Sequence, residues 1–382
     1  MSVTFPIGFL ASGVNCGLKE SDKDIALVVN TGPNFDATGV FTTNQVKAAP
    51  VLWSTEVLKT SKIKAILLNS GGANACTGSK GFQNTHKSAE LTAKLLNFGA
   101  ADVAVCSTGL IGKHLDMKKI SNGIDLLVKS LNKDGGNQAA EAILTTDSHK
   151  KVVALDKDKF KLGAMIKGAG MLAPDLATML CVITTDADIS QLKFKDILNE
   201  VVKTTLNRLD SDGCTSTNDS VILMSSGASK YSPSSDEFKN ALIEVLDELS
   251  NLLINDAEGS TKNIEITIRN AMTEDDATEV GRSIARNNLL KCAFFGEDPN
   301  WGRILAAIGN SKAKIYADKI DVTINDVLVC KSGMSCENES KIDLSNRSIK
   351  VDVDLNIGTD KATVLTNDLS IKYVHENSAY SS

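Results

Sequence analysis

The chain has 382 residues, a formal net charge of −6 at pH 7, and a composition of 42% hydrophobic and 23% charged residues. These values are typical of a globular protein that can bury a sizeable core, and the length favours two domains over one. Because the charges are of mixed sign, with no Lys- and Arg-rich run that also carries aromatic residues, the sequence predicts no nucleic-acid partner.

The sequence also argues against a membrane protein and against a metal-binding protein. The N-terminal segment MSVTFPIGFL has no basic region followed by a long apolar core, and no later apolar run approaches the ~20 residues that span a bilayer. We therefore expect a cytoplasmic protein with no membrane partner. The eight cysteines form no C-x-x-C pair and the four histidines are dispersed, which predicts reduced core cysteines and no bound metal.

In the first half of the chain, β-rich runs alternate with a helical pattern. Three short apolar runs predict strands, at residues 25–30, 65–70 and 102–107. The stretch 86–98 has the apolar spacing of an amphipathic helix. Small-residue loops at 71–78 and 108–112 follow two of the strands, and such loops can bring backbone N–H groups close to a ligand.

The second half carries longer helices between strands. A long helix is predicted at 235–256, with Gly259 as its stop signal, and a second at 273–293, opened by a Thr cap and acidic residues in its first turn. Further apolar runs predict strands at 162–166, 178–186, 264–270, 319–324, 348–355 and 361–366.

This mixture of elements predicts an α/β or α+β layered fold with two domains. We place the larger domain at 1–270 and a smaller α/β domain at 271–382. Composition alone does not choose among the layered architectures.

The segment 167–187, KGAGMLAPDLATMLCVITTDA, places Thr178 after Ala177 in apolar surroundings. A threonine hydroxyl is a poor nucleophile unless the residue is N-terminal, so that its own amine can take the proton. A catalytic Thr178 would therefore require a cut between Ala177 and Thr178. On pattern alone, a buried structural threonine in a strand remains the alternative.

The same segment contains a dinucleotide-binding pattern. Residues 168–173, GAGMLA, satisfy G-x-G-x-x-A after a strand-like run, with Asp186 downstream. The chain between Gly170 and the next strand is too short for the helical crossover that parallel strands need. A nicotinamide-dependent oxidoreductase is therefore disfavoured, and the glycines are expected to let the backbone pack tightly.

The ATML segment and eight further blocks resemble the ornithine acetyltransferase (ArgJ) family of glutamate N-acetyltransferases, in family order along nearly the whole chain. One departure is Gly72, where the family has Asn. The blocks are FPIGFLASGVNCGLK at 5–19, GVFTTNQVKAAPV at 39–51, NSGGANACTG at 69–78, CSTGLIG at 106–112, DGCTSTND at 212–219, DAEGSTK at 256–262, FFGEDPNWGRILAAIG at 294–309 and YVHENSAYSS at 373–382.

The resemblance implies an αββα sandwich and a self-cleaving acyltransferase of cyclic arginine biosynthesis. Acetyl would pass from N2-acetyl-L-ornithine to L-glutamate without a cofactor, and acetyl-CoA is a further candidate donor. The precursor would split into an α chain, 1–177, and a β chain, 178–382, assembled as an α2β2 heterotetramer. An N-terminal-nucleophile amidohydrolase or aminopeptidase, with water as acceptor, is the alternative.

The resemblance also implies roles for single residues. Thr178 would be the nucleophile, and Thr108 and Gly109 the oxyanion hole, although a turn that merely ends a strand is the alternative for that pair. Lys167 would meet an amino-acid α-carboxylate. The remaining expected substrate contacts are Thr145, whose alignment can slip to Thr146, Glu258, Asn377 and Ser382.

Glu258 stands at the predicted C-terminal end of the 235–256 helix, where a carboxylate is electrostatically unfavourable. That position favours a functional role, holding an ammonium or relaying protons. The blocks at 212–219 and 294–309 are rich in hydroxyls and turn formers, and we expect both to brace the site rather than take part in the chemistry.

Overall fold

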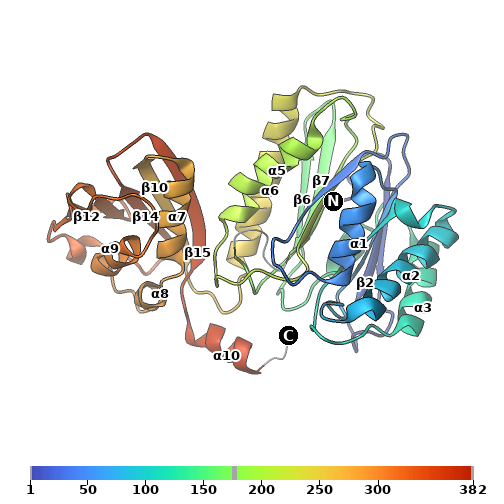
Figure 1. Ribbon diagram of the computed structural model, residues 1–382, viewed down its shortest axis with the longest axis horizontal. Coiled ribbons are helices and arrows are strands. Elements are labelled where there is room, and N and C mark those ends of the chain that lie inside the picture. The colour runs from blue at the N-terminus through green and yellow to red at the C-terminus, as the bar shows by residue number, and fades with distance from the viewer. Residues whose placement is uncertain (1, 174–178, 380–382) are drawn as a thin grey trace.

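A computed structural model describes residues 2–173 and 179–379. Its strands form three sheets (Figure 1). The first has the order β1-β2-β4-β5 and comprises Phe9–Val14, Ile25–Asn30, Ala65–Asn69 and Val103–Ser107. The second has the order β3-β9-β8-β7-β6 and comprises Ala37–Phe41, Ser220–Ser225, Leu180–Thr185, Lys161–Lys167 and Lys151–Asp156.

The third sheet has the order β13-β12-β11-β14-β10-β15. Its strands are, in that order, Met334–Ser335, Val327–Lys331, Asp321–Ile324, Ser348–Asp354, Asn263–Ala271 and Asp360–Asn367. The helices are α1 Ala49–Val57, α2 Gly78–Leu96, α3 Met117–Ser130, α4 Gly136–Ala142, α5 Phe194–Thr204, α6 Ser235–Asn255, α7 Glu274–Ala285, α8 Asn288–Phe295, α9 Trp301–Gly309 and α10 Ile371–Ala379.

The first two sheets pack face to face between helices. On β2, Ala26 and Val28 join the core between the sheets, whereas Ile25, Leu27 and Val29 pack with α2 and α3 on the outer face. The second sheet packs its inner face into the same core, and α5 and α6 cover its outer face. Both faces of these strands are buried, which explains their continuous apolar sequences. The αββα sandwich implied by the family resemblance is confirmed.

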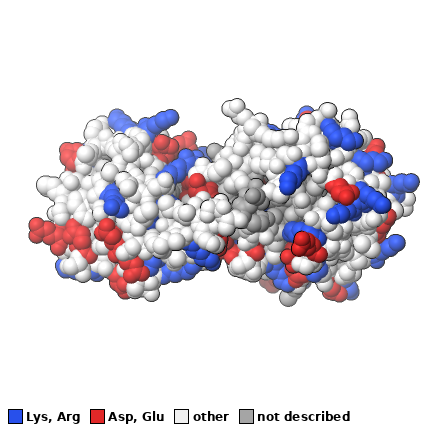
Figure 2. All heavy atoms as spheres, turned by 90° about the horizontal axis from the view of Figure 1, so that it is seen from below, with Lys and Arg blue, Asp and Glu red and all other residues white. Residues whose placement is uncertain are grey.

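The third sheet forms a separate lobe with α7, α8 and α9 packed into its core (Figure 1). β10 belongs to this sheet, pairing with β14 in parallel and with β15 antiparallel. The division near residue 271 stays a prediction, and the pairing of β10 favours a boundary before Asn263. Lys, Arg, Asp and Glu side chains are interspersed over both lobes in Figure 2.

Three helix boundaries differ from the sequence predictions. The helix predicted at 86–98 begins earlier, at Gly78. The helix predicted at 273–293 is two helices, because the side chain of Asn287 accepts the N–H of Leu290 and caps a new helix. The helix predicted at 235–256 ends at Asn255. Among the helices that the structure describes, none has the length and apolar composition needed to cross a bilayer.

Candidate active site

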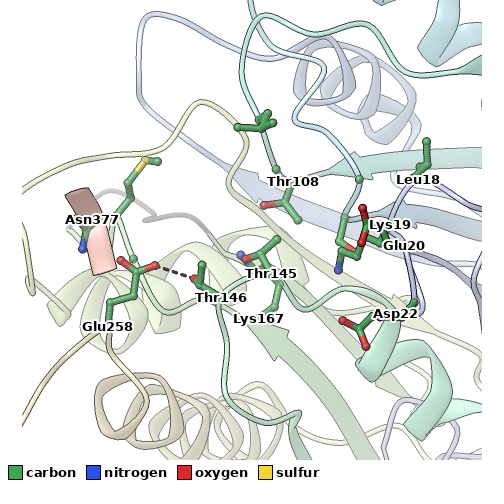
Figure 3. A pocket seen from close by; sticks show the side chains of 17 residues that line it. Leu18, Lys19, Glu20, Asp22, Thr108, Thr145, Thr146, Lys167, Glu258 and Asn377 are labelled. Carbon is green, nitrogen blue, oxygen red and sulfur yellow. Dashed lines mark hydrogen bonds between the residues drawn. The ribbon is translucent and has the colours of Figure 1, made fainter. Parts of the chain in front are cut away.

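One cavity of about 590 Å³ lies where loops after β4, β5 and β7 meet the chain near α10 (Figure 3). Six of the predicted site residues line it: Thr108, Gly109, Thr145, Lys167, Glu258 and Asn377. Ala177, Thr178 and Ser382 lie outside the described residues. The structure thus brings together around one pocket every predicted site residue that it describes, while their chemical roles stay predictions.

Thr108 and Gly109 follow β5 directly and join two small-residue loops. The N–H of Thr108 donates to the carbonyl of Asn69 at 2.9 Å, and its carbonyl accepts the N–H of Gly72 at 3.0 Å. Gly109 has φ +123°, and an added Cβ would lie 2.8 Å from the Gly72 nitrogen. Only glycine fits this conformation and this close approach.

Two hydrogen-bond donors remain available on this loop. Within residues 2–173 and 179–379, neither the hydroxyl of Thr108 nor the N–H of Gly109 has a hydrogen-bond partner. Both residues line the cavity, and the Thr108 side chain lies along it in Figure 3. Paired donors of this kind are what a developing oxyanion requires.

Lys167 ends β7 and is only 2% exposed. Burial lowers the pKa of its ammonium, and the carboxylate of Asp147 opposes that shift from 3.9 Å away. Asp147 also accepts the N–H of Gly168 at 2.7 Å. The lysine is therefore held at the cavity by its own strand and by one buried carboxylate.

A buried charge network under the pocket was not predicted from the sequence. The ammonium of Lys151 lies 2.7 Å from Asp147 Oδ1 and 2.5 Å from Asp256 Oδ2. Burial opposes ionisation of Asp147, but the charges of Lys167 and Lys151 outweigh it and hold the Asp147 pKa at about 2. The network anchors the loop that carries Thr145, whose N–H donates to Asp147 Oδ2 at 3.2 Å.

α6 ends at Asn255, so Glu258 lies beyond the helix and not, as the sequence predicted, at its C-terminal end. The connection that begins after Asn255 carries it to the pocket, where its Oε1 accepts the hydroxyl of Thr146 at 2.7 Å. Its N–H donates to the carbonyl of Ala169 at 3.0 Å. Thr145 and Thr146 both line the cavity, and the Thr146 hydroxyl is hydrogen-bonded to Glu258.

Gly170 fixes how closely Glu258 can approach. A Cβ at Gly170 would lie 2.6 Å from Glu258 Oε2. We expect Gly170→Ala to displace the carboxylate and to lower turnover roughly tenfold. Stability should change little, because a flexible side-chain end can move. Gly309→Ala, where nothing lies within 4 Å, is the matched control. Unchanged steady-state kinetics in folded Gly170→Ala would contradict a role for the Glu258 position.

The block at 212–219 braces the site, as predicted. The side-chain amide of Asn218 donates to the carbonyls of Ala73 at 2.6 Å and Ser107 at 2.8 Å. Asp219 accepts the N–H of Met179 at 2.8 Å, and its other oxygen has no partner in the described part of the chain. Burial raises the Asp219 pKa well above its usual range. The sequence analysis missed Asp219 as an individual residue.

The block at 294–309 does not brace the pocket, contrary to the prediction. Trp301 packs against the core of the third sheet and donates its indole N–H to Glu339 at 2.5 Å. None of the residues of this block lines the cavity. Its turn formers instead start α9, where the Asn300 side chain accepts the N–H of Arg303.

The C-terminal helix α10 returns to the pocket. Its Asn377 lines the cavity (Figure 3), and the hydroxyl of Ser370, just before the helix, donates to the carbonyl of Gly259 at 2.5 Å. This contact joins the C-terminal segment to the turn that carries Glu258. Asn377 thus lies at the pocket, whereas the predicted role of the tail in the active site stays a prediction.

Dinucleotide binding through residues 168–173 is contradicted by the strand directions. β7 and β8 pair antiparallel, with Lys167 opposite Leu180, so they do not form the parallel unit of a dinucleotide fold. Over residues 2–173 and 179–379, no group of three or more His, Cys, Asp or Glu side chains is placed to hold a metal ion. All eight cysteines are free thiols.

These features define a layered α/β protein with a charged pocket, lined by a buried lysine and by two donors that have no hydrogen-bond partner among the described residues. The chain belongs to the ArgJ family, whose model matches residues 10–382. This confirms the family resemblance.

Relatives cover the chain from end to end. Proteins called arginine biosynthesis bifunctional protein ArgJ from Streptomyces avermitilis and Thermobifida fusca are 55% and 50% identical, with full coverage of both chains. One from Mycobacterium tuberculosis is 50% identical over 100% of this chain and 96% of its own. A solved ornithine acetyltransferase from M. tuberculosis, complexed with ornithine, matches 47% of this chain and 96% of that chain, at 51% identity and a TM-score of 0.45.

Proposed function

We propose that this chain is a self-cleaving acyltransferase that moves acetyl from N2-acetyl-L-ornithine to L-glutamate. The observation that carries the proposal is that a buried ammonium, a carboxylate and two donors without a partner in the described part of the chain converge on one pocket. Full-length relatives named for arginine biosynthesis support the choice of substrates. Both substrates carry an α-carboxylate, for which Lys167 is the matching cation.

Self-cleavage between Ala177 and Thr178 would free the amine of Thr178. That amine, with a reference pKa of about 7.7–8, can take the proton from the Thr178 hydroxyl near neutral pH. The hydroxyl oxygen attacks the acetyl carbonyl, and Thr108 and Gly109 stabilise the negative oxygen. Collapse breaks the C–N bond and releases ornithine with the proton, leaving an acetyl ester on Thr178.

The second half-reaction reverses these steps with a new amine. The α-amine of L-glutamate attacks the ester, the oxygen of Thr178 leaves, and N-acetylglutamate departs. Glu258 is suited to hold an ammonium, whereas Thr145, Asn377 and Ser382 are proposed substrate contacts. Because the enzyme itself carries the acetyl group, no cofactor is needed, and acetyl-CoA could load the same threonine.

The proposed assembly is an α2β2 heterotetramer of chains 1–177 and 178–382, acting in the cytoplasm. Two contacts of described residues are compatible with a cut between them. Met179 is anchored to Asp219 through its N–H, and Leu180 pairs with Lys167 on β7. The residue that follows Thr178 would therefore stay in place after cleavage.

Ping-pong kinetics test the proposal. One threonine must hold the acetyl group between two amino acids that compete for Lys167, so double-reciprocal plots should be parallel. Quenched enzyme treated with N2-acetyl-L-ornithine alone should carry one acetyl mass on the 178–382 fragment. Converging plots without an acetylated fragment would favour direct transfer. Equal acetate release with and without glutamate would favour the amidohydrolase alternative.

A further inference from the structure

A second lysine, Lys19, reaches the pocket from the loop 18–22, which forms one wall of the cavity. It is half-buried, and burial lowers the pKa of its ammonium. Its Nζ donates to the carbonyl of Leu144 at 2.5 Å. Within the described ranges no carboxylate oxygen lies within 4.0 Å of this Nζ.

Other lysines in and beneath the pocket are paired. Lys167 lies beside Asp147, and Lys151 contacts both Asp147 and Asp256. Lys23, a few residues from Lys19 but outside the cavity lining, pairs with Glu141 at 2.7 Å. Among the described residues, Lys19 Nζ has one hydrogen-bond acceptor, a neutral carbonyl, which leaves further N–H donors available to an anionic ligand.

The main chain around Lys19 is fixed. Its N–H donates to Asp24 Oδ2 at 2.9 Å, and its carbonyl accepts the side-chain amide of Asn15 at 3.2 Å. Asp24 is fully buried and also accepts the N–H of Cys16 at 2.7 Å. The ammonium is therefore presented from a braced loop, which lowers the entropy lost when it meets a ligand.

The Lys19 end of the pocket carries charges of both signs, because Glu20 and Asp22 also line it, with their carboxylate oxygens more than 4.0 Å from Lys19 Nζ. In Figure 3, Glu258 and Lys19 lie on opposite sides, with Lys167 between them. The two proposed substrates share an α-carboxylate but carry side chains of opposite charge. We propose, resting on the proposed transfer reaction, that Lys19 binds the side-chain carboxylate of L-glutamate and so selects the acceptor.

The same arrangement separates the two half-reactions. The side-chain ammonium of N2-acetyl-L-ornithine is repelled by Lys19 and attracted by Glu258. L-Glutamate is attracted by Lys19 and repelled by Glu258. Each substrate can place its α-carboxylate near Lys167 while its side chain points to the residue of opposite charge, Lys19 for L-glutamate and Glu258 for N2-acetyl-L-ornithine. Lys19 should therefore contribute to the second half-reaction only.

Lys19→Met tests this assignment, because methionine keeps most of the length of the side chain and removes its charge. We expect KM for L-glutamate to rise roughly 10- to 100-fold, the loss of one charge-assisted hydrogen bond. The burst of ornithine released by N2-acetyl-L-ornithine in the absence of glutamate should keep its rate and amplitude. The preference for L-glutamate over L-glutamine as acceptor should fall by a similar factor, and Lys19→Arg should restore part of it.

Lys23→Met is the matched control and should leave all these parameters unchanged. Equal loss in both half-reactions, or an unchanged ratio of glutamate to glutamine use in Lys19→Met, overturns the role of Lys19. If the wild-type enzyme shows no ornithine burst, the proposed transfer reaction itself fails. Failure of the Lys19 assignment is thus measured on the variant, and failure of the transfer reaction is measured on the wild-type enzyme.

Discussion

Thr178→Ala is expected to remain a single full-length chain of 40.6 kDa and to lose transfer activity, by about 10⁴-fold or more. The reason is that the hydroxyl of Thr178 is proposed to act in both self-cleavage and acetyl transfer. It attacks the carbonyl of Ala177 to form an ester that water opens, and afterwards it carries the acetyl group. Intact-mass measurement of the purified protein reads the first function and an ornithine-release assay reads the second.

Thr178→Ser supplies the matched control, since it keeps a hydroxyl and a free amine after cleavage. It should yield fragments that join at 177/178 and retain part of the activity. Normal cleavage of Thr178→Ala would show that the attacking group lies elsewhere. A full-length Thr178→Ala chain that still forms an acetylated product would instead separate self-cleavage from catalysis.

The strands were predictable because their signal is local. β2 and β4 are continuous apolar runs, since each packs one face into the inner core and the other against helices. The break between α7 and α8 escaped prediction although its signal, Asn287, is also local. The apolar spacing continues across this residue, and an asparagine in such a pattern can be either a cap or an ordinary helical residue.

The pocket was predictable only in part, because family motifs mark residues but not the contacts that hold them. Asp147 and Lys151 are four residues apart, so their pairing has a weak signal in sequence. The third member of this charge network, Asp256, is 105 residues from Lys151 in the sequence. Only the packing of α6 against β6 brings Asp256 and Lys151 together. Asp219 is likewise identified only by its contact with Met179 across the sheet.

Asp147→Asn is expected to destabilise the protein by about 3–5 kcal/mol and to weaken substrate binding. The carboxylate is fully buried and separates two buried ammonium groups, those of Lys151 and Lys167. An amide keeps the shape but not the charge, so both cations lose their shared partner. Urea unfolding measures the first effect, and KM for N2-acetyl-L-ornithine measures the second.

The pH dependence gives an independent readout. The Asp147 pKa is about 2 in the folded protein, below its ordinary value of 3.8, so its ionisation stabilises the fold at higher pH. That contribution is complete above about pH 4 and is lost as the pH falls towards 2. Asp147→Asn should therefore flatten the acid limb of the stability curve, whereas Asp134→Asn, at an exposed position, should leave it unchanged. If Asp147→Asn lost stability at low pH as steeply as the wild-type protein, Asp256 alone would neutralise the buried lysines.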